Sequence, residues 1–319
     1  MKVVKVHAFF PCGGEVRDEV IISNRKFMKK YWIGCFFLFL GPGLFAQDLI
    51  DRMAEVACKC LDSLVLSSGD SINYKICLAQ GMAVTMEKAG EEDRVKMDRV
   101  ENIRKTIEQL QNRLVQSCPL FKSLILQERT DRFYAPSSVK EANVHFNQGV
   151  VYSMEKDYAK AIAEYRQALK ADDKFVKAWD NLAVVYRKSE KYKKALTCYD
   201  NSLKLFPEGR VALLNKGILL EAMKEYKPAL KSYQLYIHLY PENPEGYCGA
   251  ARVYYAQQDY EHILDYLLPA HRLYVESDSQ FQQETGRMID GVYNGMKAKG
   301  QEEFFKAKFE EYNFVLGEE

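Results

Sequence analysis

The sequence predicts an all-α fold: a right-handed α-solenoid of helical hairpins with C-terminal capping helices, preceded by a small disulfide-linked helical domain. Residue types recur at one fixed interval in the second half of the chain, which indicates stacked units that cannot bury their apolar faces alone. Small residues recur where two helices would cross closely, and four cysteines cluster before the repeats. The clearest periodic series, whose step we call the repeat interval, is Tyr158, Tyr192, Tyr226 and Tyr260.

Residues 28–46 have the features of a secretory signal peptide. Two lysines precede an apolar run, Tyr31–Leu40, and two glycines and a proline follow it. An apolar core of about ten residues is shorter than the roughly twenty that a membrane span needs. We expect cleavage after Ala46 and export to the periplasm or cell envelope, with an uncleaved membrane anchor as the alternative. Because a signal peptide should begin near its basic residues, we expect Met28 to be the start and residues 1–27 to be an upstream extension.

Residues 47–128 form a predicted three-helix domain rich in cysteine. Apolar residues at helical spacing mark the three helices, and a serine-containing turn separates the first two. In an exported chain, clustered cysteines predict a disulfide framework, which would stabilise a core as thin as this one. The cysteines are Cys58, Cys60, Cys77 and Cys118.

Four cysteines allow three pairings. We favour Cys60 with Cys77, because they lie nearly symmetrically about the first turn, and Cys58 would then pair with Cys118. Thiolate metal ligation is the alternative. The segment has no Cys-x-x-Cys pair and no histidine, so we expect disulfides and no bound metal.

Residues 129–138 are charged and contain Pro136, and we expect a hinge there. Ser138 and Glu141 have the spacing of a capping box, which predicts the start of the first repeat helix. Residues 139–277 then hold four repeats.

Each repeat contains two apolar helical patterns joined by a short turn. In the second unit, Trp179, Leu182 and Tyr186 share one helix face, and a second stripe begins at Tyr192. Pro207 ends that second helix, and Pro241 stands one repeat interval later in the third unit. We expect Trp179 to fill the space between its own unit and the preceding hairpin.

The pattern resembles the tetratricopeptide repeat family over about residues 142–277, in four units. The resemblance is strongest in the second unit and weakest in the fourth, which carries Pro269 inside its second helix. Four units in one register make the signal specific. In the second unit the family positions are Trp179, Leu182, Ala183, Tyr186, Ala195, Tyr199, Ser202 and Pro207.

Residues 278–319 leave the repeat register and are predicted to cap the array. A long amphipathic pattern ends at Gly300, and the phenylalanines after it predict a final helix. Terminal units of a solenoid need a polar outer face, which such helices supply.

The composition and motifs favour neither catalysis nor nucleic-acid binding. With a net charge of +1 and a pI of about 7.5, the chain has no basic field for nucleic acid. The five histidines lack metal-ligand spacing, and no phosphate loop or serine nucleophile motif occurs. We therefore expect no catalytic residue, no metal and no cofactor.

The resemblance implies a concave groove, lined by the first helices of the units, that receives an extended peptide or a partner helix. Asparagines recur in it at the repeat interval and would either hold a ligand backbone or bond their own helix. Phe146 and Val150 replace the Lys and Asn with which some chaperone-binding members hold a terminal carboxylate. The predicted groove residues are Phe146, Asn147, Val150, Lys177, Asn181, Val184, Lys188, Leu214, Asn215, Ile218 and Arg252.

These features predict a non-catalytic exported scaffold or adaptor that binds a protein or peptide, and we expect the partner to belong to the cell envelope. Membrane contact is expected only through the signal peptide before cleavage. The alternative is a thiol-exchange enzyme, or an accessory subunit of an envelope enzyme complex, that uses the cysteine-rich domain. Lys59, between Cys58 and Cys60, is the feature that favours this alternative.

Overall fold

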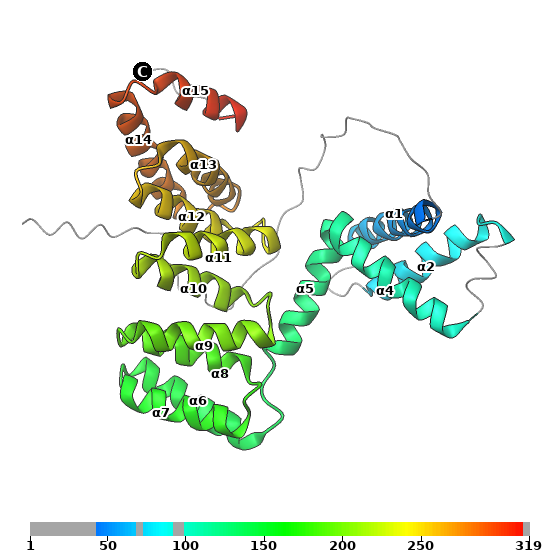
Figure 1. Cartoon of the computed structure of the whole chain (residues 1–319), viewed down its shortest axis with the longest axis horizontal. Helices are drawn as coiled ribbons and strands as arrows, with labels where there is room; N and C mark the ends of the chain where they lie inside the picture. The colour runs from blue at the N-terminus through cyan, green and yellow to red at the C-terminus, as the bar shows by residue number, and fades with distance from the viewer. Residues whose placement is uncertain (1–42, 68–72, 92–98, 315–319) are drawn as a thin grey trace, which may run out of the picture. The chain divides into compact units, whose positions relative to one another are not determined.

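The computed structural model describes residues 43–67, 73–91 and 99–314, and the regular secondary structure in these residues is all helical (Figure 1). The chain divides into two compact units, one ending at Arg132 and the other containing everything from Phe133 onward. Among the described helices, none is both long enough and apolar enough to span a bilayer.

The two N-terminal segments that the sequence sets apart lie almost wholly outside the described residues. This holds for the upstream extension at 1–27 and for the signal peptide at 28–46, of which only 43–46 are described, as the start of the first helix. Export and cleavage therefore stay predictions.

The N-terminal unit packs four described helices around one apolar core. On the first helix, Met53, Ala57 and Leu61 follow at steps of four and are completely buried, together with Leu110 and Leu114 further along the chain. Such a stripe is what an amphipathic helix needs to bury one face. The helices are α1 (Gly43–Ser67), α2 (Tyr74–Glu87), α4 (Val100–Ser117) and α5 (Pro119–Phe133).

Two disulfides connect these helices. Cys58 pairs with Cys118 and Cys60 pairs with Cys77, which is the pairing that the sequence favours. Residues two apart on a helix point to nearly opposite sides, so the two cysteines of α1 reach different neighbours, the end of α4 and the helix α2. Each bond contributes about 2–4 kcal/mol by restricting the unfolded chain.

The unit has one helix more than the three predicted, and the predicted hinge is shorter. Cys118 has an extended backbone, with φ −123° and ψ 99°, and Pro119 begins a new helix immediately after it. Proline suits the first position of a helix because its missing N–H would have no partner there. Since α5 runs to Phe133, the first half of the predicted hinge at 129–138 is helical.

The second unit is a stack of helical hairpins followed by two further helices (Figure 1). Each hairpin consists of two consecutive helices, and the first helix of each also packs on the second helix of the hairpin before it. The hairpins are α6–α7, α8–α9, α10–α11 and α12–α13. Their bounds are Lys140–Met154, Tyr158–Ala171, Val176–Lys188, Tyr192–Leu205, Arg210–Ala222, Tyr226–Leu239, Pro244–Ala256 and Tyr260–Glu276.

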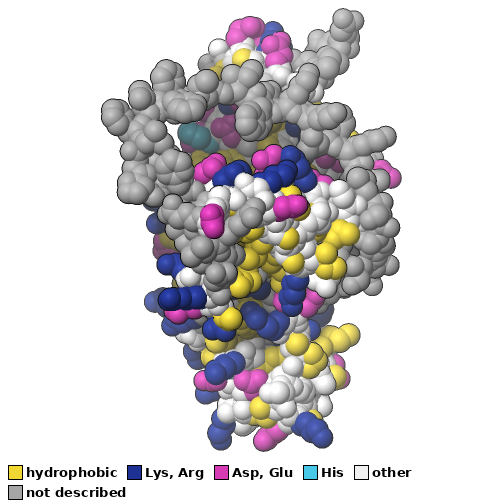
Figure 2. Space-filling view, turned by 90° about the vertical axis from the view of Figure 1, so that its right-hand side faces the viewer, with side chains coloured by type: hydrophobic (Ala, Val, Ile, Leu, Met, Phe, Trp, Pro, Cys, Tyr) yellow, Lys and Arg dark blue, Asp and Glu magenta, His cyan; other side chains and the backbone are white. Residues whose placement is uncertain are grey.

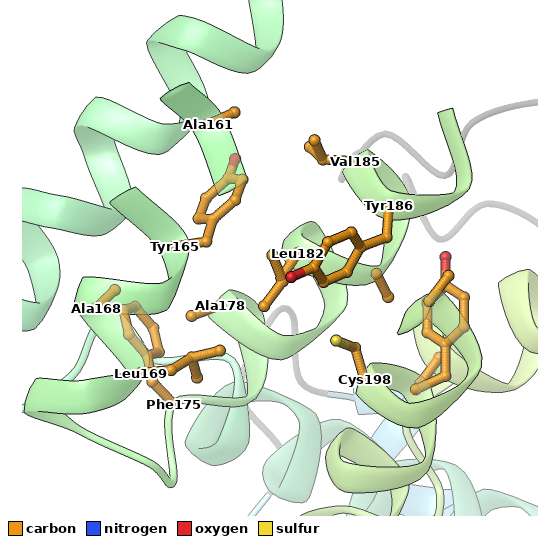
Figure 3. Packing of buried hydrophobic residues seen from close by; sticks show 14 of the residues in the cluster. Ala161, Tyr165, Ala168, Leu169, Phe175, Ala178, Leu182, Val185, Tyr186 and Cys198 are labelled. Atoms are coloured by element: carbon orange, nitrogen blue, oxygen red, sulfur yellow. The ribbon is translucent and has the colours of Figure 1, made fainter. Parts of the chain in front are cut away.

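Periodic tyrosines fill the core of the stack. Tyr165, Tyr199 and Tyr233 come from α7, α9 and α11 and are completely buried. Figure 3 shows Leu182 and Tyr186 of α8 between side chains of α7 on one side and Cys198 of α9 on the other. The large rings fill the space between successive hairpins, as the periodic pattern predicts.

Each hairpin turn contains one residue in the left-handed conformation, and these residues recur at the repeat interval. Lys156, Glu190, Lys224 and Gln258 have φ between 57° and 62°. The residue that follows donates its N–H to a carbonyl in the last turn of the helix, as Lys191 does to the Tyr186 carbonyl at 2.8 Å. This geometry is the Schellman ending of a helix, in which glycine is the usual residue at the left-handed position.

The first repeat helix begins differently from the prediction. The capping box between Ser138 and Glu141 does not form, since α6 begins at Lys140 without a side-chain cap on its first N–H groups. Instead, the Asn143 amide accepts from the Ser137 N–H at 3.0 Å and donates to the Ser137 carbonyl at 2.6 Å. An amide side chain can do both because it carries a donor and an acceptor.

Two helices close the C-terminal end, as predicted. They are α14 (Gln282–Ala298) and α15 (Glu302–Glu311). Together with α13, which continues through Pro269, they enclose an apolar cluster that contains Ile289, Val292, Met296 and Phe305. The last hairpin therefore has its apolar face covered.

Candidate functional site

The predicted groove lies on the first helices of the hairpins, α6, α8 and α10. On α8 the predicted residues Lys177, Asn181, Val184 and Lys188 are spaced by four, three and four, so they lie on one face of the helix. Lys188 is exposed and the other three are half-buried. This face is therefore accessible to a ligand along the length of the helix.

The asparagine series bonds partly to its own helices. The Asn181 side chain donates to the Lys177 carbonyl at 2.9 Å, and the Asn215 side chain donates to the Val211 carbonyl at 3.0 Å. Each amide keeps a carbonyl oxygen and a second N–H, so local bonding leaves capacity for a ligand backbone. Asn215 is only 9% exposed, whereas Asn147 is exposed.

Apolar groove residues sit at the boundary between core and surface. Phe146, Val150, Val184 and Ile218 are half-buried and pack against the clusters of buried side chains. Leu214 is different, since it is 1% exposed and belongs to the interior of the stack. Its side chain is therefore not available to a ligand in this structure.

Arg252 also differs from its expected place as a cation at the groove edge. It is 8% exposed, and its guanidinium donates to both oxygens of the Glu221 carboxylate, at 3.0 and 2.9 Å. The Tyr233 hydroxyl donates to the same carboxylate at 2.8 Å, and burial raises the pKa of Tyr233 well above its usual value. A bidentate pair of this kind neutralises the arginine and fixes its plane.

Beside this pair lies a hollow of about 380 Å³. Glu221 and Arg252 form one wall, and Tyr255, Gln258 and Tyr260 form others. Sequence reasoning missed Glu221 and Tyr255. The spacing of Glu221 and Arg252 could have indicated the pair. Glu221 precedes Arg252 by slightly less than one repeat interval, so the two residues lie on neighbouring first helices, α10 and α12, and their positions along these helices differ by about one turn.

Residues 133–137, which we call the strap, lie along the turns of the stack. The Tyr134 hydroxyl donates to the Asp180 carboxylate at 2.5 Å, and the Ser137 hydroxyl donates to the Asp172 carboxylate. The second half of the predicted hinge is therefore held against the repeats by hydrogen bonds to charged groups, which are stronger than those between neutral groups.

Burial raises the pKa of Asp180 to about 6, although the hydroxyl groups of Ser202 and Tyr134 oppose this rise. The residue is 2% exposed, so water cannot solvate the charge of its carboxyl group. We interpret Asp180 as a structural group that anchors the strap, because its carboxyl is buried and accepts the hydrogen bond of the Tyr134 hydroxyl.

The features of an enzyme site are few in the described part of the chain. No group of histidine, cysteine and acidic residues there could hold a metal ion. Cys58 and Cys60 are both in disulfides, and Lys59 pairs with Glu55 at 2.6 Å. The thiol-exchange alternative needs a thiolate beside an unpaired lysine. These residues instead form two disulfides and a lysine–glutamate ion pair.

Charges are mixed on the surface that Figure 2 presents. Lys and Arg side chains lie among Asp and Glu side chains there, rather than in one basic area. This distribution agrees with the small net charge of the whole chain.

Comparison with known proteins identifies the repeats. Family models described as tetratricopeptide repeat match residues 142–175, 176–208 and 211–243. These matches cover the first three hairpins, in the same register that the sequence shows. A search of curated proteins found no match to the chain.

Several solved structures resemble part of the chain. The first repeat domain of Spaghetti (RPAP3), bound to an HSP90 peptide, is 22% identical, with 38% of this chain and 96% of that chain covered and a TM-score of 0.37. MamA from Desulfovibrio magneticus RS-1 is 16% identical, with 55% and 95% covered and a TM-score of 0.46. YrrB, described as having an unusual peptide-binding site, is 17% identical, with 53% and 91% covered and a TM-score of 0.37.

Proposed function

Because the chain belongs to the tetratricopeptide repeat family, we propose that it is a non-catalytic scaffold whose groove binds an extended segment of another protein. The family and the fold support a protein-binding adaptor. The groove consists of the accessible residues of α6, α8 and α10 already described, without Leu214, Asn215 and Arg252, which are buried.

One observation carries the proposal: apolar and amide side chains alternate along the groove in a repeated order. Val184 follows Asn181 by one helical step of three, and Ile218 follows Asn215 by the same step, one repeat interval further on. An amide can bond the backbone of an extended peptide, and a half-buried apolar side chain can contact its side chains. The first two hairpins therefore present an accessible pair of this kind to successive parts of one ligand, and in the third hairpin Ile218 is the accessible member because Asn215 is buried.

The proposal includes export and a partner in the cell envelope. It rests on the signal-peptide pattern at 28–46 and on the two disulfides of the N-terminal unit, because disulfides persist in oxidising compartments and are rare in the cytosol. Mass spectrometry of the exported protein should find a mature chain that begins at Gln47. A mature chain that retains Tyr31–Leu40 would contradict this part of the proposal.

The groove is tested by a charge placed on it. Ile218→Asp and Val184→Asp should each weaken partner capture at least tenfold, because the new carboxylate must lose water without gaining a counter-charge. Gln167→Asp is the matched control, since it adds the same charge at an exposed position on α7. Capture is measured by pull-down with the purified full chain, and circular dichroism checks that each variant is folded.

Asn147→Ala serves as a milder variant if the aspartate variants unfold, since Asn147 is exposed. Folded variants with undiminished capture would overturn the groove assignment. Free-thiol counting on the purified protein then separates the scaffold from a thiol-exchange enzyme. A scaffold keeps all four N-terminal cysteines oxidised, whereas an exchange enzyme cycles one pair to free thiols during turnover.

A further inference from the structure

A second hollow lies on the face of the stack opposite the groove. It has a volume of about 490 Å³ and lies over α8, between α7 and α9. On α8 its residues Trp179, Leu182 and Tyr186 follow at steps of three and four, whereas Asn181 and Val184 of the groove lie on the other side of the same helix. This hollow, which we call the basic pocket, is therefore a surface separate from the groove.

The floor of the basic pocket is apolar. Leu182 and Tyr186 are almost fully buried beneath it, and Trp179 is half-buried beside them. Trp179 lies between its own hairpin and α7, as the sequence predicts, but it fills that space only in part: it is half-buried, and its indole N–H donates to the Asp173 carbonyl at 2.8 Å. Since this N–H is already bonded, the indole offers a ligand only apolar ring surface.

The rim of the pocket is cationic. Arg166 and Lys170 of α7 and Lys194 of α9 are exposed there, and Asp173 is the one acidic residue among the lining residues, so the lining carries three positive charges and one negative, a net +2. Within the described residues, none of these three cations is in an ion pair. Lys194 lies above the Tyr186 ring, with its nitrogen 5.8 Å from the ring centre.

The like charges of the rim repel one another, and a ligand of opposite charge would remove this repulsion. Arg166 and Lys170 are four residues apart on one helix, and like charges so placed destabilise a helix. A carboxylate between them and Lys194 would relieve the repulsion and form charge-assisted hydrogen bonds. An apolar side chain attached to the same segment would cover the floor.

We propose that the basic pocket binds an acidic segment of a protein partner, which inserts one aromatic or aliphatic side chain against Trp179 and Leu182. The carboxylates of the segment pair with the cations of the rim. Charge complementarity selects this occupant, since a basic or neutral segment would leave the three cations unpaired. The pocket is independent of the groove, so one chain can hold two partner segments at once.

Trp179 makes the binding directly visible. The chain has two tryptophans, Trp32 and Trp179, so Trp32→Phe in the full chain leaves Trp179 as the single reporter. The probe is a synthetic peptide with a central phenylalanine and glutamates on both sides. Titration should change the Trp179 fluorescence in a saturable way, and affinity should fall as salt is added.

Variants of the rim test the position of the site. Arg166→Glu with Lys170→Glu should weaken binding of the probe at least tenfold. Lys227→Glu with Lys231→Glu is the matched control, because these lysines are also exposed and four residues apart, on the second helix of the third hairpin. The control should leave the affinity unchanged, and circular dichroism confirms the fold of both.

Four results would overturn the proposal. One is equal affinity of the rim variant and the control. Another is equal binding of a peptide with lysines in place of the glutamates. The third is a change in the oligomeric state of the rim variant without any binding of the probe, which would make a second copy of the chain the occupant. Loss of binding in Val184→Asp alone would also contradict it, because the probe would then lie in the groove.

Discussion

Replacing Gly249 by alanine should destabilise the protein, although the same change usually stabilises a helix. A Cβ atom built at Gly249 would lie 2.5 Å from Cζ and 2.6 Å from Cδ1 of the Tyr233 ring. The ring cannot withdraw, because Gly217 of α10 also lies against it, where an added Cβ would be 2.5–2.9 Å from ring atoms, and its hydroxyl is bonded to Glu221 and Arg252.

The expected size follows from two opposing effects. Alanine gains about 1 kcal/mol over glycine in a helix interior. Overpacking a close-packed core costs about 1–3 kcal/mol, and here it also disturbs the Glu221–Arg252 pair. We therefore expect a net loss of up to about 2 kcal/mol in the free energy of unfolding.

Gly291→Ala is the matched control. Gly291 is an exposed residue within α14, and nothing lies within 4 Å of the position of its Cβ. This variant should gain about 0.5–1 kcal/mol. Urea unfolding followed by circular dichroism measures both variants. If Gly249→Ala were as stabilising as the control, the close packing of α12 on the Tyr233 ring, and with it the register of the third and fourth hairpins, would be refuted.

Three further changes test other parts of the structure. Asp180→Asn should remove a pH dependence of stability. Because the pKa of Asp180 is raised to about 6, its contribution to the free energy of unfolding is greatest below about pH 4, where the carboxyl is protonated, and falls by up to about 3 kcal/mol as the pH rises through 6. Thermal melts of the variant at these pH values should therefore differ less than those of the parent. Lys224→Gly should stabilise the protein by about 1 kcal/mol, because φ of 62° suits glycine; a loss in urea unfolding would contradict that backbone geometry. Arg252→Met should cost about 1.5–3 kcal/mol by removing the charged hydrogen bonds to Glu221, and a melt like that of the parent would show that the pair is not formed.

Much of the repeat unit could be predicted because its signals are local and periodic. The buried tyrosines, exemplified by Tyr165 and Tyr199, occupy one position of the second helix in the first three hairpins, and burial of one apolar stripe fixes that position from the sequence alone. The disulfide pairing is the favoured one of three, since Cys60 and Cys77 flank one turn. That Asn181 and Asn215 mark the face of a groove stays a prediction.

What could not be predicted depends on contacts between distant parts of the chain. Phe146 and Leu214 stand at the same position of their repeats, yet one is half-buried and the other buried, because α10 packs on the hairpin before it whereas α6 belongs to the first hairpin. The Arg252–Glu221 pair turns a presumed surface cation inward for the same reason. The surface position of Trp179 depends on a hydrogen bond to the backbone of a preceding turn, which the sequence pattern does not record.

The central claim is that a protein partner binds along the groove formed by α6, α8 and α10. The most direct test places a photo-crosslinking amino acid at Asn147, which is exposed in the groove, and at Lys231, which is exposed on α11, and irradiates cells that produce each full-length variant. We expect a protein adduct from position 147 that disappears when Ile218→Asp is added, and none of the same size from position 231. An adduct of the same protein from position 231, or an adduct from position 147 that persists with Ile218→Asp, would contradict binding along the groove.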